Sequence, residues 1–262
     1  MKIKILTLFP NMYNGFLSES IIKRAIEKNL VEFEIIDYRK YSNDKHNHVD
    51  DTPCGGGAGM VIRCDVIDRA LKDNTNNNSY KILLTPQGDV FNQKIAFDLS
   101  KKDEIVLICG HYEGFDERIR SYVNSEISIG DFVLTGGEIP AMAISDSIVR
   151  LLDDVIKEDS FMDDSFSNGL LEYPQYTRPI EYDGKKVPDI LLSGDHKKIE
   201  KYRLKESLRK TYLRRKDLLD KKELTNEEKK LLDEIKKEES IWDLQVYYFT
   251  YHLFQENMEL VL

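Results

Sequence analysis

Short apolar segments alternate with amphipathic ones through the first half of the chain. Four segments rich in aliphatic and β-branched residues predict strands, at residues 2–9, 31–38, 81–84 and 105–109. Between them, apolar residues at steps of three and four predict helices, at about residues 16–29, 65–71 and 92–100. Strands that alternate with helices are typical of a mostly parallel sheet with helices on both faces. The pattern therefore predicts an α/β fold.

Three predicted strands end in loops that contain glycine. These loops are Thr85–Gly88, Gly110–Gly114 and Ser128–Gly137. Within the last, the apolar run Phe132–Leu134 predicts a strand, and a helical pattern begins after Gly137. In open α/β sheets, ligands bind beyond the carboxyl ends of strands, where glycine lets a ligand approach the backbone. The three loops predict one ligand site, although glycines that only form turns would produce the same pattern.

A further glycine-rich stretch, Cys54–Met60, contains four glycines in five residues. It is not a dinucleotide-binding fingerprint, because Met60 stands where the last glycine would be, and it lacks the Gly-Lys-Ser/Thr of a phosphate-binding loop. Ordering such a loop costs backbone entropy, so we expect it to approach a flat or bulky ligand, such as a base or a ribose. Of the preceding Asp50 and Asp51, we expect one to cap the turn, and the other could bind donor edges of guanine.

The character of the chain changes after Leu152. Residues 153–169 are acidic and poor in aliphatic residues, which predicts a linker or mobile loop. Charged helical segments follow, and the first has ten Lys and Arg residues against two Glu residues between His196 and Lys216. The whole chain has a net charge of −9, so this basic helix indicates either a phosphate-backbone partner or a solvated helix face. The aromatic segment 242–262 predicts no function.

The composition argues against several classes of protein. No apolar run approaches the ~18 residues of a membrane span, and the first residues lack the apolar core and cleavage site of a signal peptide. The three cysteines, Cys54, Cys64 and Cys109, show no Cys-x-x-Cys spacing, which argues against a disulfide scaffold and against zinc. The five histidines are scattered and predict no metal site. We therefore expect a cytoplasmic protein without a membrane segment.

Six motifs in one order resemble those of the bacterial tRNA (guanine-N1)-methyltransferase family of the knotted SPOUT class. Five lie at residues 49–61, 84–88, 108–119, 128–142 and 164–179, and the sixth is LLSGDH, from Leu191, with the RLKESLRKTYLRR that follows. The resemblance extends over about residues 1–235. It implies an α/β fold whose mostly parallel sheet carries a trefoil knot in its C-terminal half, which composition and periodicity could not reveal. It divides the chain into a knotted domain at 1–159, a flexible linker at 160–173 and a smaller helical, tRNA-binding domain at 174–262.

The resemblance implies an activity: S-adenosylmethionine-dependent methylation of N1 of the guanine immediately 3′ of the anticodon in tRNA, a modification that supports reading-frame maintenance. It also implies a homodimer with each active site at the subunit interface. Guanine N1 carries a proton, which a carboxylate in hydrogen-bond reach can remove as general base. Asp164 matches the family's catalytic aspartate, and Arg150 matches its arginine, which would stabilise charge developing on O6. A helix cap or a solvated acid is the alternative for Asp164, and a surface ion pair is the alternative for Arg150.

The same resemblance implies the ligand contacts. It assigns to the cofactor Leu83, Leu84, Thr85, Pro86, Gln87, Gly88, Gly110, Tyr112, Glu113, Ser128, Ile129, Gly130, Phe132, Leu134, Gly136, Gly137 and Pro140. It assigns to the tRNA substrate Asp50, Gly55, Gly56, Gly57, Ala58, Gly59, Met60, Ser165, Glu172, Arg203, Arg209, Arg214 and Arg215. The family's activity is thought to need magnesium, yet the sequence predicts no dedicated metal site. Cys54, Phe132 and Glu172 depart from the tyrosine, tyrosine and aspartate that relatives often carry.

Two other activities remain as alternatives. One is a ribose 2′-O-methyltransferase of the same knotted class, which would not need the Asp164 segment or the loop at residues 49–61. The other is a non-catalytic RNA-binding protein that has kept the fold, for which loss of Asp164 or Arg150 would be expected. Both residues and the loop are present, so the sequence favours the base methyltransferase.

Overall fold

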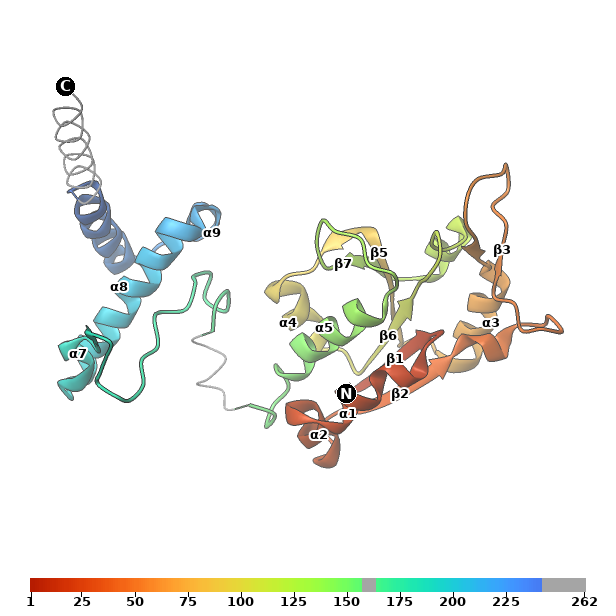
Figure 1. The fold of residues 1–262 in the computed structure, drawn as a ribbon, viewed down its shortest axis with the longest axis horizontal. Helices are drawn as coiled ribbons and strands as arrows, with labels where there is room; N and C mark the ends of the chain where they lie inside the picture. The colour runs from red at the N-terminus through yellow and green to blue at the C-terminus, as the bar shows by residue number, and fades with distance from the viewer. Residues whose placement is uncertain (157–163, 242–262) are drawn as a thin grey trace, which may run out of the picture. The chain divides into compact units, whose positions relative to one another are not determined.

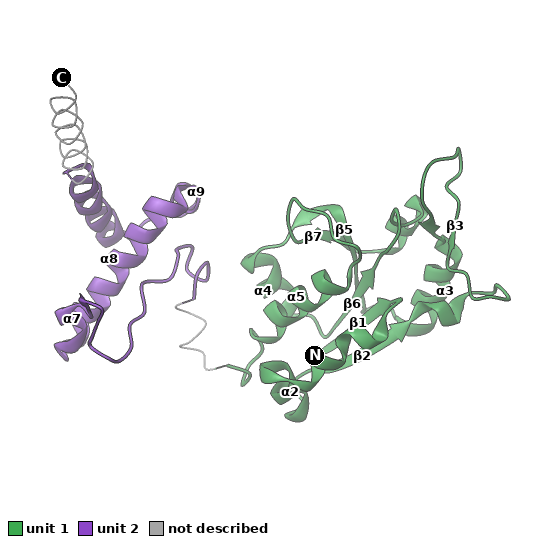
Figure 2. Ribbon diagram, in the orientation of Figure 1, with its two compact units in different colours: residues 1–158 green, residues 159–262 purple. Residues whose placement is uncertain are grey.

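The computed structural model describes residues 1–156 and 164–241 (Figure 1). The chain divides into two compact units, residues 1–158 and 159–262 (Figure 2), and each is treated by itself below. The predicted linker at 160–173 therefore begins with four residues outside the described part, and the aromatic segment 242–262 lies outside it entirely. Within the described ranges, no helix is long and apolar enough to cross a membrane.

The first unit is built on a five-stranded sheet in the order β2-β1-β6-β5-β7. The strands are β1 (Lys2–Thr7), β2 (Glu32–Asp37), β5 (Tyr80–Val90), β6 (Glu104–Cys109) and β7 (Ser125–Ser128). Every pairing in this sheet is parallel; in β1, for example, Ile5 stands opposite Ile35 of β2 and Leu107 of β6. The prediction of an α/β fold with a mostly parallel sheet is confirmed.

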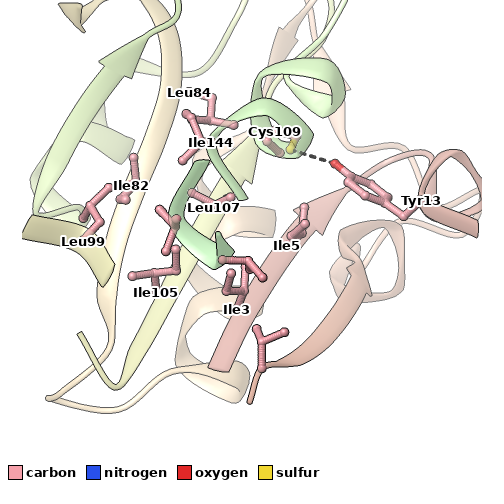
Figure 3. Packing of buried hydrophobic residues seen from close by; sticks show 14 of the residues in the cluster. Ile3, Ile5, Tyr13, Ile82, Leu84, Leu99, Ile105, Leu107, Cys109 and Ile144 are labelled. Atoms are coloured by element: carbon pink, nitrogen blue, oxygen red, sulfur yellow. Dashed lines mark hydrogen bonds between the residues drawn. The ribbon is translucent and has the colours of Figure 1, made fainter. Parts of the chain in front are cut away.

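Helices cover both faces of the sheet because its central strands are apolar on both sides. Along β6, Ile105, Leu107 and Cys109 belong to one buried cluster and Val106 and Ile108 to the other. The first cluster (Figure 3) also receives side chains from α2 (Ser20–Glu27), α4 (Gln93–Ser100) and α5 (Glu138–Val149). The second receives them from α3 (Cys64–Asn74) and the short helices η2 (Tyr38–Tyr41) and η3 (Glu117–Tyr122). Each fully buried aliphatic side chain stabilises this fold by about 1.5–3 kcal/mol.

Local signals set the remaining helices of the first unit. Pro10 opens the short helix η1 (Pro10–Tyr13), where its fixed φ suits a first turn. The helix α1 (Asn14–Ser18) follows directly and is separated from α2 by Glu19; Ser20, the first residue of α2, has a φ of +57°. The sequence pattern had suggested one continuous helix here. The side chain of Asn92 accepts a hydrogen bond from Ile95 N over 3.1 Å and so caps α4.

Two of the predicted strand ends were wrong. Phe132–Leu134 forms no strand, and the strand of this region is β7, seven residues earlier at Ser125. Val133 is 85% exposed, so the apolar run lies on the surface of the described unit instead of in the sheet. The loop Thr85–Gly88 does not end its strand either. It is an irregularity inside β5, where the pairing with β7 shifts register between Leu84 and Asp89.

The second unit is mostly helical in its described part. A hairpin of β8 (Glu181–Tyr182) and β9 (Lys185–Lys186) precedes α7 (Asp189–Leu192), α8 (His196–Arg214) and α9 (Lys216–Lys221), and residues 226–241 are also helical. The Asp195 side chain caps α8 by accepting a hydrogen bond from Lys198 N over 3.2 Å. The core of this unit consists of Leu170, Leu208, Leu219, Leu231, Leu232 and Ile235. Leu170, which lies inside the predicted linker, is thus part of a packed core.

Candidate active site

A cavity of about 370 Å³ opens at the irregularity inside β5 and at the carboxyl ends of β6 and β7. Its walls come from three segments: the Thr85–Gln87 irregularity, residues 110–117 and residues 127–137. These are the glycine-containing loops that the sequence analysis placed around one ligand. Every residue predicted to contact the cofactor lines this cavity except Gly88. The binding of a cofactor there remains a prediction, but the residues proposed for it are brought together.

Gly88 has a structural role next to the cavity. A Cβ at this position would collide with the backbone of Glu126 and Ile127 in β7. Glycine therefore allows β5 to return to β7 immediately after the irregularity at Thr85–Gln87. Gly88 therefore affects the path of the backbone that forms the cavity wall, although Gly88 itself does not line the cavity.

Several residues that line the cavity had not been singled out from the sequence. Arg120 of η3 contacts Gln87, Glu126 and Glu117, so it connects the wall formed by β5 with the wall formed by β7. Others that line it are His111, Gly114, Phe115, Asp116, Glu117, Ile127, Val133 and Thr135. Most of them lie inside the quoted motifs, and that position was the available signal. Arg120 lies just beyond its motif, and no local pattern marks it.

The carboxylate of Asp116, which lines the cavity, is held by a single guanidinium. Arg118 donates to Asp116 from Nε over 2.8 Å and from Nη2 over 2.6 Å. These bonds outweigh the opposing effect of burial and lower the pKa of Asp116 below its ordinary value. Asp116 is therefore ionised at neutral pH and also caps η3 through Arg118 N.

The glycine-rich loop lies beside this cavity. It connects β3 (Asp50–Asp51) and β4 (Val61–Ile62), which pair antiparallel. Met60 O accepts a hydrogen bond from Glu113 N over 2.9 Å, so the end of the loop is fixed to the cavity segment 110–114. Glycines at 55, 56, 57 and 59 all have φ between +78° and +138°, a region that other residues rarely adopt. Ala58 lies among them and is exposed.

The two aspartates before the glycine loop differ in role. Asp51 Oδ1 accepts a hydrogen bond from Thr52 N over 2.7 Å, which is the capping role expected of one of them. Asp50 is half-buried in β3 and is the one that stays a candidate for binding the substrate.

The two catalytic candidates lie in different units of the chain. Arg150 follows the last residue of α5 in the first unit, where its backbone N–H caps the helix by donating to Asp146 O over 3.1 Å. Asp164 lies in the second unit and is half-buried, and its carbonyl accepts a hydrogen bond from Ser167 N over 3.2 Å. Nearby, Ser165 Oγ accepts a hydrogen bond from Glu172 N over 3.0 Å, so two predicted substrate residues are in contact.

The four predicted substrate arginines in or next to α8 differ in whether other residues already hold them. Arg209 is ion-paired with Glu206, Glu238 and Glu239, and Arg215, just after the helix, is paired with Asp217 over 2.8 Å. Arg203 stacks on the Tyr173 ring, with 4.8 Å between the guanidinium carbon and the ring centroid. Arg214 is exposed and has no ion pair among the residues that the structure describes. Arg214, together with the exposed Lys197, Lys198 and Lys201, is therefore the more accessible cation for a phosphate backbone.

Across residues 1–156 and 164–241, no group of three or more His, Cys, Asp or Glu side chains is placed to hold a metal ion.

A family model described as tRNA (Guanine-1)-methyltransferase TrmD matches residues 1–221. The chain belongs to this family. The matched range covers the cavity, the glycine-rich loop, Arg150, Asp164 and the whole of α8. It also includes every residue that the sequence analysis assigned to a ligand or to catalysis.

Curated relatives give the same result at high identity. A Fusobacterium nucleatum protein named tRNA (guanine-N(1)-)-methyltransferase is 62% identical over 241 residues, covering 91% of this chain and 100% of the relative. A Bacillus subtilis protein of the same name is 55% identical over 243 residues, again covering 91% of this chain and all of the relative. The resemblance found from six motifs is confirmed.

Proposed function

We propose that this protein transfers a methyl group from S-adenosylmethionine to N1 of the guanine immediately 3′ of the anticodon in tRNA. The observation that carries the proposal is the cavity between the β5 irregularity and the carboxyl ends of β6 and β7, within a chain of the tRNA (guanine-1)-methyltransferase family. A tRNA substrate agrees with the cytoplasmic location expected from the sequence. The ribose 2′-O-methyltransferase alternative is not favoured by the family match.

The cavity fits the cofactor in size and in lining. Its volume of about 370 Å³ lies in the range of small-molecule sites. Backbone of Gly110, Gly136 and Gly137 faces it, and a Cβ at any of the three would collide with a neighbouring residue. Because these residues have no side chain, a ligand such as the adenosine moiety can lie close to the backbone of this wall. When bound, S-adenosylmethionine supplies a methyl group on a good leaving group.

The residues of this chain then have to handle one proton and one developing charge. Guanine N1 becomes a nucleophile when its proton moves to a base, and we assign that step to the Asp164 carboxylate. Electron density moves toward O6 as the proton leaves, and the Arg150 guanidinium would stabilise it. With the cofactor bound, the methyl group would pass from its sulfur to guanine N1, and the electron pair of the broken methyl–sulfur bond would remain on sulfur.

Two surfaces of the protein support the proposed binding of tRNA and the proposed homodimer. The exposed cations of α8 suit the phosphate backbone of tRNA. Near the cavity, Phe132 and Ile139 are each 53% exposed and Val133 is 85% exposed. Large apolar side chains clustered in this way are typical of a protein interface. They support the homodimer with the active site at the subunit interface.

The experiment that tests the reaction is a transfer assay with nucleoside analysis. The protein is incubated with methyl-labelled S-adenosylmethionine and unmodified tRNA, and the tRNA is digested to nucleosides. Recovery of the label as 1-methylguanosine would support the proposal. Recovery as a 2′-O-methylated nucleoside would support the ribose methyltransferase instead. Binding of both ligands without transfer would support the non-catalytic RNA-binding protein.

A further inference from the structure

A buried carboxylate lies behind the wall of the cavity. Glu138 begins α5 and is 1% exposed, although glutamate is almost never fully buried unless it is paired. Thr7 Oγ1 donates to Glu138 Oε1 over 2.7 Å, and His111 Nε2 lies 2.8 Å from Glu138 Oε2. His111 lines the cavity, whereas Glu138 does not. Burying a carboxylate is strongly unfavourable unless it is paired and hydrogen-bonded. The contacts with Thr7 and His111 therefore make the burial of Glu138 possible.

The histidine ring is fixed from three sides. Its ring packs against Phe9, with 4.7 Å between the centroids, and Phe9 N donates to Thr7 Oγ1 over 2.9 Å. Gly136 packs against a second side of the ring, where a Cβ would collide with both the imidazole and the Glu138 carboxylate. The hydrogen bond with Glu138 is the third contact. The ring therefore has little freedom to turn while the bond to Glu138 is in place.

The bond joins two of the three segments that form the cavity. His111 belongs to the loop 110–114, and Glu138 follows directly on Gly136–Gly137. The next residue after His111 is Tyr112, whose φ of +60° is a left-handed conformation that residues with a side chain seldom adopt. Such a conformation persists only where surrounding contacts hold it. The Glu138–His111 bond is placed to be one of those contacts.

We propose that Glu138 is a positioning residue, which fixes His111 and thereby holds the loop 110–114 in the shape that binds the cofactor. This inference depends on the proposed function, because it takes S-adenosylmethionine as the ligand of the cavity. Because a carboxylate anion can only accept hydrogen bonds, we take His111 Nε2 as the donor in the bond. Without the bond, part of the binding free energy is spent on ordering the loop, so affinity for the cofactor falls. Proton transfer from guanine is not affected directly.

Three variants distinguish the bond from simple packing. Glu138→Gln keeps the shape of the side chain but replaces the carboxylate by a neutral amide, so His111 loses a charged hydrogen-bond acceptor. His111→Ala removes the donor. His111→Gln keeps an amide donor that can reach the carboxylate. We expect the first two to weaken S-adenosylmethionine binding, measured by calorimetry, about tenfold or more, and His111→Gln to remain within about threefold of wild type.

The steady-state constants separate positioning from a general structural role. In Glu138→Gln, we expect a raised KM for S-adenosylmethionine, with an unchanged KM for tRNA and with kcat within about threefold at saturating cofactor. The control is Asp98→Asn, which removes an exposed carboxylate from α4 and should change none of these constants. If Glu138→Gln does not fold, the comparison of His111→Gln with His111→Ala decides the matter by itself.

The two proposals fail in different ways. Wild-type affinity in both Glu138→Gln and His111→Ala would overturn the positioning role and leave the proposed function intact, as would equal losses in His111→Gln and His111→Ala. A wild-type protein that binds no S-adenosylmethionine would overturn the proposed function itself.

Discussion

The backbone of Gly137 packs directly against Cys109. A Cβ on Gly137 would lie 2.7 Å from Cys109 Cα, and Gly137 N donates to Gly110 O over 2.9 Å. Cys109 is fully buried at the end of β6. Burial, and after it the charge of Glu138, raises the pKa of its thiol, so Cys109 is a neutral packing group. Two loops of the cavity can meet at this place only because residue 137 has no side chain.

The first prediction concerns this contact. In Gly137→Ala the added methyl group has to push apart the ends of β6 and α5, so the free energy of unfolding should fall by about 1–3 kcal/mol. Because the displaced backbone belongs to the cavity wall, the variant should also bind S-adenosylmethionine more weakly. Urea unfolding and calorimetry measure the two effects.

The matched control is Gly15→Ala in α1. A Cβ on Gly15 meets nothing within 4 Å, and its φ is not positive. Alanine should therefore be neutral or stabilise the helix by about 0.5–1 kcal/mol. If Gly137→Ala behaves like Gly15→Ala in both measurements, the close packing described here is not important for the cavity.

The second prediction tests the general base. Asp164→Asn keeps the size of the side chain but removes its ability to accept a proton. We expect kcat to fall by about 10²–10⁴-fold, while the dissociation constant for S-adenosylmethionine stays within a few-fold of wild type. Single-turnover methyl transfer and calorimetry give these values. Normal turnover in the variant would show that another group accepts the proton.

The third prediction separates the two kinds of arginine near α8. Arg214 is exposed, whereas Arg209 is held by three glutamates. Arg214→Gln should therefore reduce the slope of log Kd for tRNA against log salt by about 1. Arg209→Gln should leave the slope unchanged and lower the melting temperature, because Glu238 and Glu239 lose a partner. A salt slope that is flat in the wild type would argue against a phosphate-contacting role for this helix.

The fourth prediction concerns pH and the pair of Asp116 with Arg118. The Arg118 guanidinium lowers the pKa of Asp116 in the folded state, so folding is favoured wherever the carboxylate is ionised. This contribution is fully present above the unfolded pKa of about 4. It is lost as the pH falls through the lower, folded pKa. In Asp116→Asn, unfolding measured between about pH 2.5 and 7 should lose this component and show a shallower decline on acidification.

Much of the candidate site could be predicted from the sequence because glycine marks close backbone approach. Gly110, Gly136 and Gly137 all line the cavity that the three glycine-containing loops had indicated. The same kind of reasoning was wrong at Phe132–Leu134, because three adjacent apolar residues predict burial but do not say what buries them. Val133 is 85% exposed in the described unit. An exposed apolar segment can have the composition of a strand.

Contacts between distant charged residues could not be predicted. Glu138 stands 27 residues from His111, and its surroundings in the sequence suggest only an ordinary acidic first turn of a helix. Likewise, the basic pattern of α8 cannot show that Arg209 is already paired with Glu238 and Glu239, about 30 residues away. Such pairs depend on how helices and strands are packed together, and periodicity within one segment contains no information on that packing.

The most direct test of the central claim is the choice of base. Two transcripts of one tRNA are compared, with guanine or adenine immediately 3′ of the anticodon, and initial rates of label transfer from S-adenosylmethionine are measured at equal tRNA saturation. We predict transfer to the guanine transcript, recovered as 1-methylguanosine, and none above background to the adenine transcript. Equal transfer to both transcripts would contradict the account.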